Sequence, residues 1–134
     1  MRIVIVEDDE MILKSLCFFL KTGGYEVVAF DNGEDAIEYV QANYSQIRLM
    51  ITDLNLPFAG GKEVIHTTRQ IKGASIPIIV LTSSGVEATE LEVLNLGADE
   101  FISKPFSPAV LLKRIQKLIL QYNSTKPLRM IDQQ

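Results

Sequence analysis

The sequence predicts an α/β domain, a doubly wound parallel sheet with helices on both of its faces. Two observations predict this fold class. Short, uninterrupted apolar segments alternate along the chain with longer segments whose apolar residues recur every three or four positions. The first pattern is typical of strands buried on both faces of a parallel sheet, and the second of amphipathic helices. Five strands alternating with five helices imply right-handed crossovers and a three-layer α/β/α arrangement.

Five apolar segments are predicted to be strands. They cover residues 3–6, 25–30, 47–52, 77–82 and 100–103. The first is an unbroken run of β-branched residues, as expected for a central strand. The fourth begins at Pro77, and a missing backbone N–H is tolerated at the first residue of a strand.

Helical periodicity occupies the segments between and after the strands. It extends over residues 10–21, 36–40, 64–71, 87–96 and 111–122. Gly23 and Gly24 are the residues expected after a helix end, and Asn32 is a typical N-cap. Ser107 and Pro108 form an N-cap and a first-turn proline for the last helix.

One domain accounts for most of the chain. At 134 residues, a folded chain buries roughly two-thirds of its unfolded surface, which is enough for a core without disulfides. The apolar periodicity is lost after Tyr122. We therefore interpret residues 1–122 as the domain and residues 123–134 as a C-terminal tail or the start of a linker to an output domain.

The composition excludes several classes of protein. Lys and Arg total 13 against 17 Asp and Glu, which gives a formal net charge of −4 and disfavours direct nucleic-acid binding by this domain. Cys17 is the only cysteine, so no disulfide can form within the chain. No apolar run approaches the ~20 residues of a membrane helix, and no signal-peptide pattern is present. We therefore expect a cytoplasmic protein that makes no membrane contact.

Polar residues follow four of the predicted strands. Glu7 and Asp8 come after the first strand, Asp53 after the third, Thr82 at the end of the fourth and Lys104 after the fifth. In doubly wound sheets, ligands bind outside the carboxyl ends of the strands, where the winding direction reverses. The sequence therefore predicts a functional site that these residues form together.

The residue types in this site favour phosphoryl chemistry with a metal ion. Neighbouring carboxylates repel one another unless a cation lies between them, and Mg²⁺ prefers such oxygen ligands. A metal ion, an ammonium group and a hydroxyl can together hold the oxygens of a phosphoryl group. Asp53 would then be either a metal ligand or a carboxylate nucleophile that forms an aspartyl phosphate.

Four stretches of the chain resemble the receiver domain of bacterial two-component response regulators, including the chemotaxis receivers. They are residues 6–8 (VED), 53–57 (DLNLP) with Gly61, 81–83 (LTS) and 97–106 (GADEFISKPF). The resemblance extends from about residue 2 to residue 122. It implies a flavodoxin-like sheet with the strand order 2-1-3-4-5, and a signalling module that assists its own phosphorylation and slow dephosphorylation but is not a metabolic enzyme.

The resemblance also implies a role for each site residue. Asp53 would accept a phosphoryl group from a phosphohistidine of a sensor histidine kinase or a phosphotransfer protein. Asp8, Asp53 and the backbone carbonyl of Asn55 would bind Mg²⁺, with Glu7 acting through water. Thr82 and Lys104 would contact the phosphoryl oxygens.

The switch in such domains involves the residues at positions 82 and 101. Phe101 would swing inward when Thr82 moves toward the phosphoryl group, and Lys104-Pro105 would be a cis peptide. Phe101 lacks the phenol oxygen that many receivers have there, so the switch would depend on ring packing alone.

The resemblance implies partners outside the chain. These are a DNA-binding output domain, through which the receiver would regulate transcription, and a second copy in a phosphorylation-dependent homodimer. Glu92 and Val110 stand where the winged-helix subgroup commonly has a basic and an acidic residue, so one ion pair of that dimer would be lost.

Two other classes remain open at this point. A flavodoxin-like cofactor binder would share the fold, but four acids follow the first strand where a phosphate-binding loop is needed. A small Mg²⁺-dependent phosphatase with an Asp nucleophile would turn over phosphate monoesters.

Several conspicuous residues have a simpler interpretation. We expect Asp9 and Glu10 to be solvated charges at a helix start, Cys17 to be a small core residue and His66 to lie on a helix surface. The aromatic residues Phe18, Phe19 and Phe30 are expected to pack.

Overall fold

The structure, a computed structural model, describes residues 1–83 and 87–132. A single parallel sheet has the strand order β2-β1-β3-β4-β5. Its strands are β1 (Arg2–Val6), β2 (Glu26–Phe30), β3 (Ile47–Asp53), β4 (Ile78–Thr82) and β5 (Glu100–Ser103). The predicted fold class and strand order are confirmed, and each predicted strand limit differs from the observed one by one residue at most.

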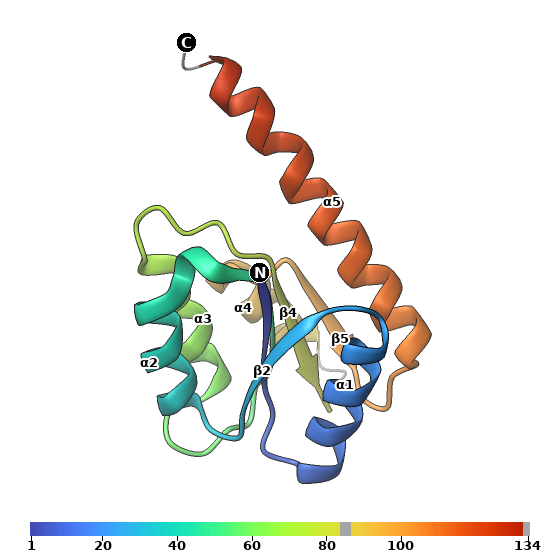
Figure 1. Ribbon diagram of the computed structural model, residues 1–134. Coiled ribbons are helices and arrows are strands. Elements are labelled where there is room, and N and C mark those ends of the chain that lie inside the picture. Colours follow the sequence, from blue (N-terminus) through green and yellow to red (C-terminus); the bar gives the residue numbers. More distant parts are fainter. Residues whose placement is uncertain (84–86, 133–134) are drawn as a thin grey trace.

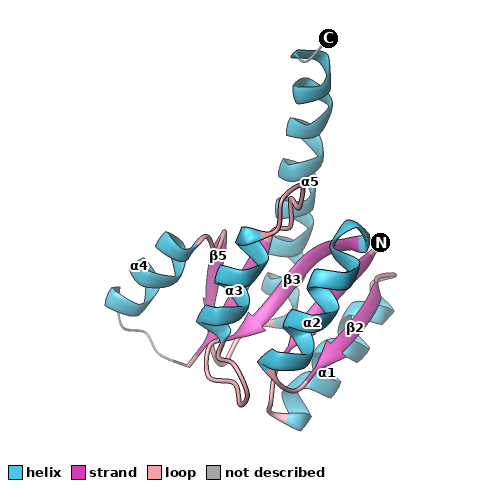
Figure 2. Cartoon of the chain, turned by 90° about the vertical axis from the view of Figure 1, so that its left-hand side faces the viewer, coloured by secondary structure: helices cyan, strands magenta, loops and turns pink. Residues whose placement is uncertain are grey.

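Helices cover both faces of the sheet. They are α1 (Glu10–Thr22), α2 (Gly33–Asn43), α3 (Gly61–Gln70), α4 (Glu87–Leu96) and α5 (Pro108–Asp132), with a short 3₁₀ turn at Tyr44–Gln46. The helices α1 and α5 pack on one face, and α2, α3 and α4 on the other (Figure 2). The chain therefore forms the three layers that a doubly wound sheet requires.

The apolar run of β1 explains why both faces need a cover. Successive side chains of a strand point to opposite faces of its sheet. Ile3 and Ile5 lie in the core beneath α1 and α5, whereas Val4 and Val6 lie in the core beneath α2 and α3. All four side chains are fully buried, so the strand has no polar face.

The helix ends follow the sequence signals. The Asp9 carboxylate caps α1 by accepting a hydrogen bond from the Ile12 N–H at 3.1 Å, and Gly23 ends that helix. Asn32 caps α2 in the same way, with 2.8 Å to the Asp35 N–H. The Ser107 hydroxyl accepts from the Val110 N–H at 3.4 Å at the start of α5.

One helix end departs from expectation. The loss of apolar periodicity predicts an end near Tyr122, but the backbone of α5 stays helical to Asp132 and extends well beyond the sheet (Figure 1). Helical backbone hydrogen bonds close within the helix itself, so they do not require an apolar face to pack against. Whether residues 123–134 form a linker stays a prediction. Among the described residues, no helix is long and apolar enough to cross a membrane.

Candidate functional site

The parallel register brings the predicted site residues to one edge of the sheet. Val6 lies opposite Thr52, Asp53 opposite Leu81 and Thr82 opposite Ser103. Glu7 and Lys104, the residues next along the chain from β1 and β5, therefore lie at the same edge as Asp53 and Thr82. This is the carboxyl edge, where the sequence predicts the site.

Three carboxylates come together at this edge. Glu7, Asp8 and Asp53 each offer an oxygen atom, and these atoms all lie within 4.8 Å of one another. Glu7 is fully buried and Asp53 is 5% exposed, whereas Asp8 is exposed. The cluster is therefore open to solvent mainly on the side of Asp8.

Lys104 supplies the positive charge inside the cluster. Its Nζ donates to Glu7 Oε1 at 2.6 Å and to Asp53 Oδ2 at 3.3 Å. Charges buried this deeply need a partner, because burial removes the water that would otherwise solvate them. The ammonium group thus links the ends of β1, β3 and β5 while leaving an excess of negative charge.

Backbone N–H groups orient the buried carboxylates. The Asp9 N–H donates to Glu7 Oε2 at 3.2 Å, so each Glu7 oxygen has a partner. The Leu54 N–H donates to Asp53 Oδ1 at 2.8 Å, while Oδ2 faces Lys104. Hydrogen bonds of this kind fix the rotamers and the direction in which the remaining lone pairs point.

Burial and charge shift two titrations in the site. Burial raises the pKa of the Glu7 carboxyl above its ordinary value and the Asp53 charge raises it too, against the lowering effect of the hydrogen bond from Lys104. Burial alone would lower the pKa of Lys104, but the hydrogen bond to Glu7 and the charge of Asp53 outweigh it, so this pKa is raised. Lys104 therefore stays a cation at neutral pH.

The donor set fits a hard divalent cation. Glu7, Asp8 and Asp53 provide only carboxylate oxygens, the ligands that Mg²⁺ prefers. No sulfur or imidazole ligand lies in this cluster of described residues, so softer metals have no advantage. The residues present are thus suited to magnesium.

A pocket of about 390 Å³ adjoins the cluster on the side of α3 and α4. Thr82, which is 3% exposed, lines it together with the exposed Asn55. The other residues that line it are Leu54, Gly60, Lys62 and Thr89. The predicted site residues Thr82 and Asn55 therefore border one space beside Asp53.

Of the two residues assigned to the switch, Thr82 lines this pocket and Phe101 lies on the neighbouring strand β5. Phe101 is half-buried against the core beneath α2, α3 and α4, one strand away from Thr82. The Lys104-Pro105 peptide is cis, as expected. The structure thus holds Phe101 partly inside the protein.

The sequence analysis missed two residues near the site. Lys62 lines the pocket beside Asp53 and pairs with Glu92 at 2.9 Å. Gly33 contacts the loop after β3 so closely that an added Cβ would meet the Ala59 oxygen at 1.9 Å. The sequence shows that a charged residue, Lys62, directly follows Gly61. It does not show where this side chain lies, because that depends on how α3 packs on β3.

The simpler interpretations are confirmed with one exception. His66 is exposed on α3, and Cys17 is partly buried against the core, where burial raises the pKa of its thiol. Phe19 and Phe30 are partly buried, but Phe18 is 74% exposed, so the expectation that it packs is wrong. Phe18 lies two turns after Met11 on the same outward face of α1, and both side chains are exposed.

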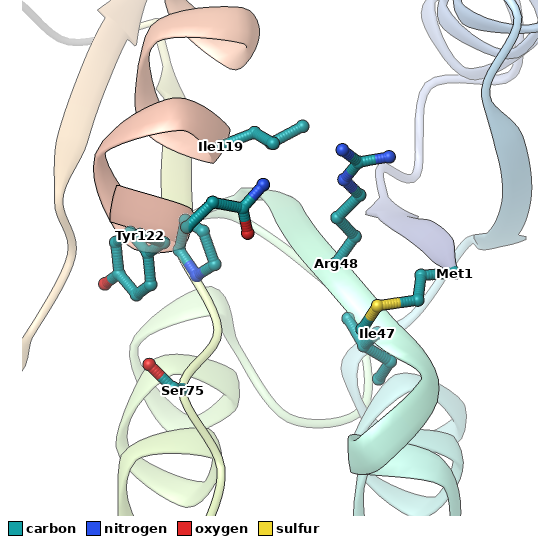
Figure 3. Close-up of a pocket in the computed structure, with 8 residues that line it drawn as sticks. Met1, Ile47, Arg48, Ser75, Ile119 and Tyr122 are labelled. Atoms are coloured by element: carbon teal, nitrogen blue, oxygen red, sulfur yellow. The ribbon is translucent and has the colours of Figure 1, made fainter. Parts of the chain in front are cut away.

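A second pocket lies at the other end of the sheet (Figure 3). It has a volume of about 190 Å³, and Ile47 and Pro77 place it at the amino ends of β3 and β4. Arg48 is the charged side chain that lines it, and no carboxylate does. It is therefore separate from the acidic cluster and shares none of its residues.

A family comparison identifies the class of protein. The family model for the response regulator receiver domain matches residues 3–116. The chain therefore belongs to the response regulator receiver domain family, whose members are signalling proteins rather than metabolic enzymes and typically bind Mg²⁺ at an acidic pocket.

Individual relatives are named as response regulators or as transcriptional regulatory proteins. Response regulator RR06 of Streptococcus pneumoniae is 38% identical over 91% of this chain and 54% of its own length. The phosphate regulon transcriptional regulatory protein PhoB of Escherichia coli is 34% identical over 88% of this chain and 51% of its own length. The chain thus spans about half the length of the curated relatives it matches.

Solved structures agree with the fold. A CheY-like receiver domain from Methanospirillum hungatei matches with a TM-score of 0.86 at 27% identity, covering 92% of this chain and 97% of that one. The chemotaxis response regulator CheY4 of Vibrio cholerae matches with a TM-score of 0.78 at 28% identity, covering 87% and 96%.

Proposed function

We propose that this domain accepts a phosphoryl group on Asp53 and thereby switches an output domain or partner, as a phosphorylation-controlled receiver. The observation that carries the proposal is the convergence of Glu7, Asp8, Asp53 and Lys104 at the carboxyl edge of the sheet. Family membership supports the same activity. The four residues provide a nucleophile, oxygen ligands for a metal ion and a cation for a developing charge.

Asp53 would act as the nucleophile. One carboxylate oxygen attacks the phosphorus of a phosphohistidine, a P–O bond forms, and the P–N bond to the imidazole breaks with its electron pair left on nitrogen. The Leu54 N–H holds Oδ1, so the carboxylate enters the reaction already oriented. Water later attacks the aspartyl phosphate, releases inorganic phosphate and restores the carboxylate.

The other residues would stabilise the charge of the transferred group. Lys104 Nζ lies 3.3 Å from Asp53 Oδ2, close enough to contact an oxygen of a phosphoryl group on Asp53. The Thr82 hydroxyl borders the same space. Glu7, Asp8, Asp53 and the Asn55 carbonyl would hold Mg²⁺, which when bound neutralises charge on the phosphoryl oxygens.

The switch would couple Thr82 to Phe101. Movement of Thr82 toward the phosphoryl group leaves room beside β4, and Phe101 on the neighbouring β5 is only partly buried. Further burial of its ring would change the surface formed by α4, β5 and α5. A DNA-binding output domain that reads this surface is consistent with relatives named as transcriptional regulators.

The phosphodonor would be a histidine kinase or a phosphotransfer protein. An apolar pocket of about 340 Å³ lies between α1 and the segment after β5, and both Ile12 and Lys104 line it. Met11 lines it too and is 80% exposed. A helical partner carrying the phosphohistidine fits an apolar surface next to Asp53.

Incubation with acetyl phosphate and Mg²⁺ tests the proposal. We expect intact mass spectrometry to detect one added phosphoryl group, which chelation of Mg²⁺ prevents. The Asp53→Asn variant should gain none. Asp31→Asn, which alters an exposed carboxylate just after β2, should behave as the wild type does.

Three outcomes would contradict the proposal. They are the lack of an adduct on the wild type, an adduct that persists in Asp53→Asn, and an adduct that forms equally well without a divalent metal. Rapid turnover of phosphate monoesters would instead favour the phosphatase, and bound flavin would favour the cofactor binder.

A further inference from the structure

Lys62 is a second amino group beside the acidic cluster. Its side chain lines the pocket of about 390 Å³ that Asn55 and Thr82 also line. It therefore borders the same space as two of the predicted site residues.

The backbone of Lys62 is fixed close to Asp53. The preceding residue, Gly61, donates its N–H to the Leu54 oxygen at 2.9 Å. A Cβ added to Gly61 would meet the Asp53 carbonyl oxygen at 2.2 Å, so α3 begins in contact with the end of β3. Lys62 therefore directly follows the residue that contacts the end of β3, where Asp53 lies.

The partner of Lys62 holds it only weakly. Its Nζ pairs with Glu92 Oε1 on α4 at 2.9 Å, and the two side chains are 50% and 53% exposed. Exposed ion pairs of this kind contribute little, because water and salt screen them. The lysine can exchange Glu92 for another anion at small cost.

The charge of the site favours such an exchange. The carboxylates of Glu7, Asp8 and Asp53 outnumber the one ammonium group of Lys104. A phosphodonor brings further negative charge to this acidic edge. A bound Mg²⁺ would only cancel the excess of carboxylates, so a second cation at the open side of the site adds an attraction for the negative donor.

We propose that Lys62 binds the phosphoryl oxygens of the incoming phosphodonor, and that Glu92 competes with the phosphodonor for this lysine. Glu92 thus restrains phosphorylation by holding Lys62 on α4. This inference rests on the proposed function, since it concerns phosphorylation of Asp53.

Opposite effects of two substitutions test the inference. The rate of Asp53 phosphorylation by acetyl phosphate with Mg²⁺ is measured by intact mass at low ionic strength. We expect Lys62→Gln to slow phosphorylation about threefold and Glu92→Gln to accelerate it about twofold, within the range for an exposed charge. Both effects should shrink at high salt.

The double variant separates binding from a structural role. If Glu92 acts only through Lys62, Lys62→Gln/Glu92→Gln matches Lys62→Gln alone. If the pair only stabilises the packing of α3 on α4, both single variants shift the rate in the same direction. That result would overturn the inference, and so would rates equal to that of the wild type.

Matched controls remove the effect of net charge. Lys72→Gln and Glu38→Gln change exposed residues away from the pocket and should leave the rate unchanged. A wild-type protein that is not phosphorylated on Asp53 overturns the proposed function and this inference with it. A phosphorylated wild type with unaffected Lys62 and Glu92 variants overturns the inference alone.

Discussion

The buried pair of Glu7 and Lys104 defines the site at the scale of single residues. Their contact of 2.6 Å links residues that are 97 positions apart in the sequence. Glu7 was expected to act on a metal through water, and the structure adds a direct hydrogen bond to Lys104. Strand order determines which residues share an edge, but side-chain packing decides which of them touch.

Side-chain packing also explains why the sequence did not predict Lys62 as a site residue. Asp53, Thr82 and Lys104 follow strands, so a parallel sheet alone brings them together. Lys62 belongs to the helix α3, and the position of its side chain depends on how closely α3 approaches β3. That approach is possible because residue 61 is a glycine.

Substitution of two neighbouring glycines tests this close approach. Gly61→Ala places a methyl group 2.2 Å from the backbone carbonyl oxygen of Asp53, so the backbone must shift. We expect this variant to lose about 2 kcal/mol or more in the free energy of unfolding. At Gly60 a Cβ meets nothing closer than 3.6 Å, and its φ of −78° suits alanine. Gly60→Ala should therefore change stability by less than about 0.5 kcal/mol.

Urea denaturation followed by circular dichroism measures both variants. Equal stability of the two proteins would show that the end of β3 yields to the methyl group, which would contradict tight packing between Gly61 and Asp53. Slower phosphorylation in Gly61→Ala alone would show that the packing also positions Asp53.

At the scale of elements, periodicity predicted which segments are helices better than it predicted their exposure or length. Met11 and Phe18 lie seven residues apart on α1 and are both exposed, although both are apolar. The sequence contains no signal that separates a residue facing the core from one facing a partner. In α5, Leu118 and Ile119 are buried, and the helix continues past the last residues that pack.

Two leucines of α5 test which face of the helix packs. Leu111 is fully buried against β1 and β3 residues of the core, whereas Leu120 is 68% exposed. We expect Leu111→Ala to lower the free energy of unfolding by about 2–5 kcal/mol, because it removes buried methyl groups and leaves a cavity. Leu120→Ala should change it by less than about 0.5 kcal/mol.

Thermal and urea unfolding of the two variants provide the comparison. A large loss in Leu120→Ala would indicate that α5 packs against something else through its outer face, such as a second copy of the chain. In that case the loss would depend on protein concentration.

At the scale of the whole molecule, one polar network joins α5 to the far side of the sheet. Tyr122 donates its hydroxyl proton to the Asp99 carboxylate, with oxygen distances of 2.9 and 3.0 Å. Asp99 also accepts from Arg69 at 3.0 Å and from the Ile78 N–H at 2.8 Å. Arg69 in turn donates to the Ile76 and Gly97 oxygens.

This network fixes the place where α5 leaves the domain. It connects the end of α3, the start of β4, the turn before β5 and the last packed turn of α5. A change that moves α4 and β5 would therefore reach the part of α5 that extends beyond the sheet (Figure 1). Tyr122 is the α5 residue that reaches this network, through its two contacts with Asp99.

The pH dependence of stability tests the contribution of Tyr122. Burial, together with the hydrogen bond to Asp99, raises the pKa of Tyr122 from its ordinary value of 10.0 to about 12. The unfolded chain loses this proton first as the pH rises, so the stabilisation is complete below pH 10 and is lost between pH 10 and about 12. At pH 8 we expect Tyr122→Phe to be less stable than the wild type by about 1 kcal/mol, the net value of one hydrogen bond.

The difference between the two proteins is the quantity to follow, because lysines also lose protons in this range. Urea unfolding at pH 8, 10 and 11.5 should give a gap in the free energy of unfolding between the wild type and Tyr122→Phe that is largest at pH 8 and smallest at pH 11.5. A gap that stays constant with pH would show that the phenol is not held by Asp99 in the folded protein. A gap that grows with pH would contradict the raised pKa itself, since the sign of the linkage would then be reversed.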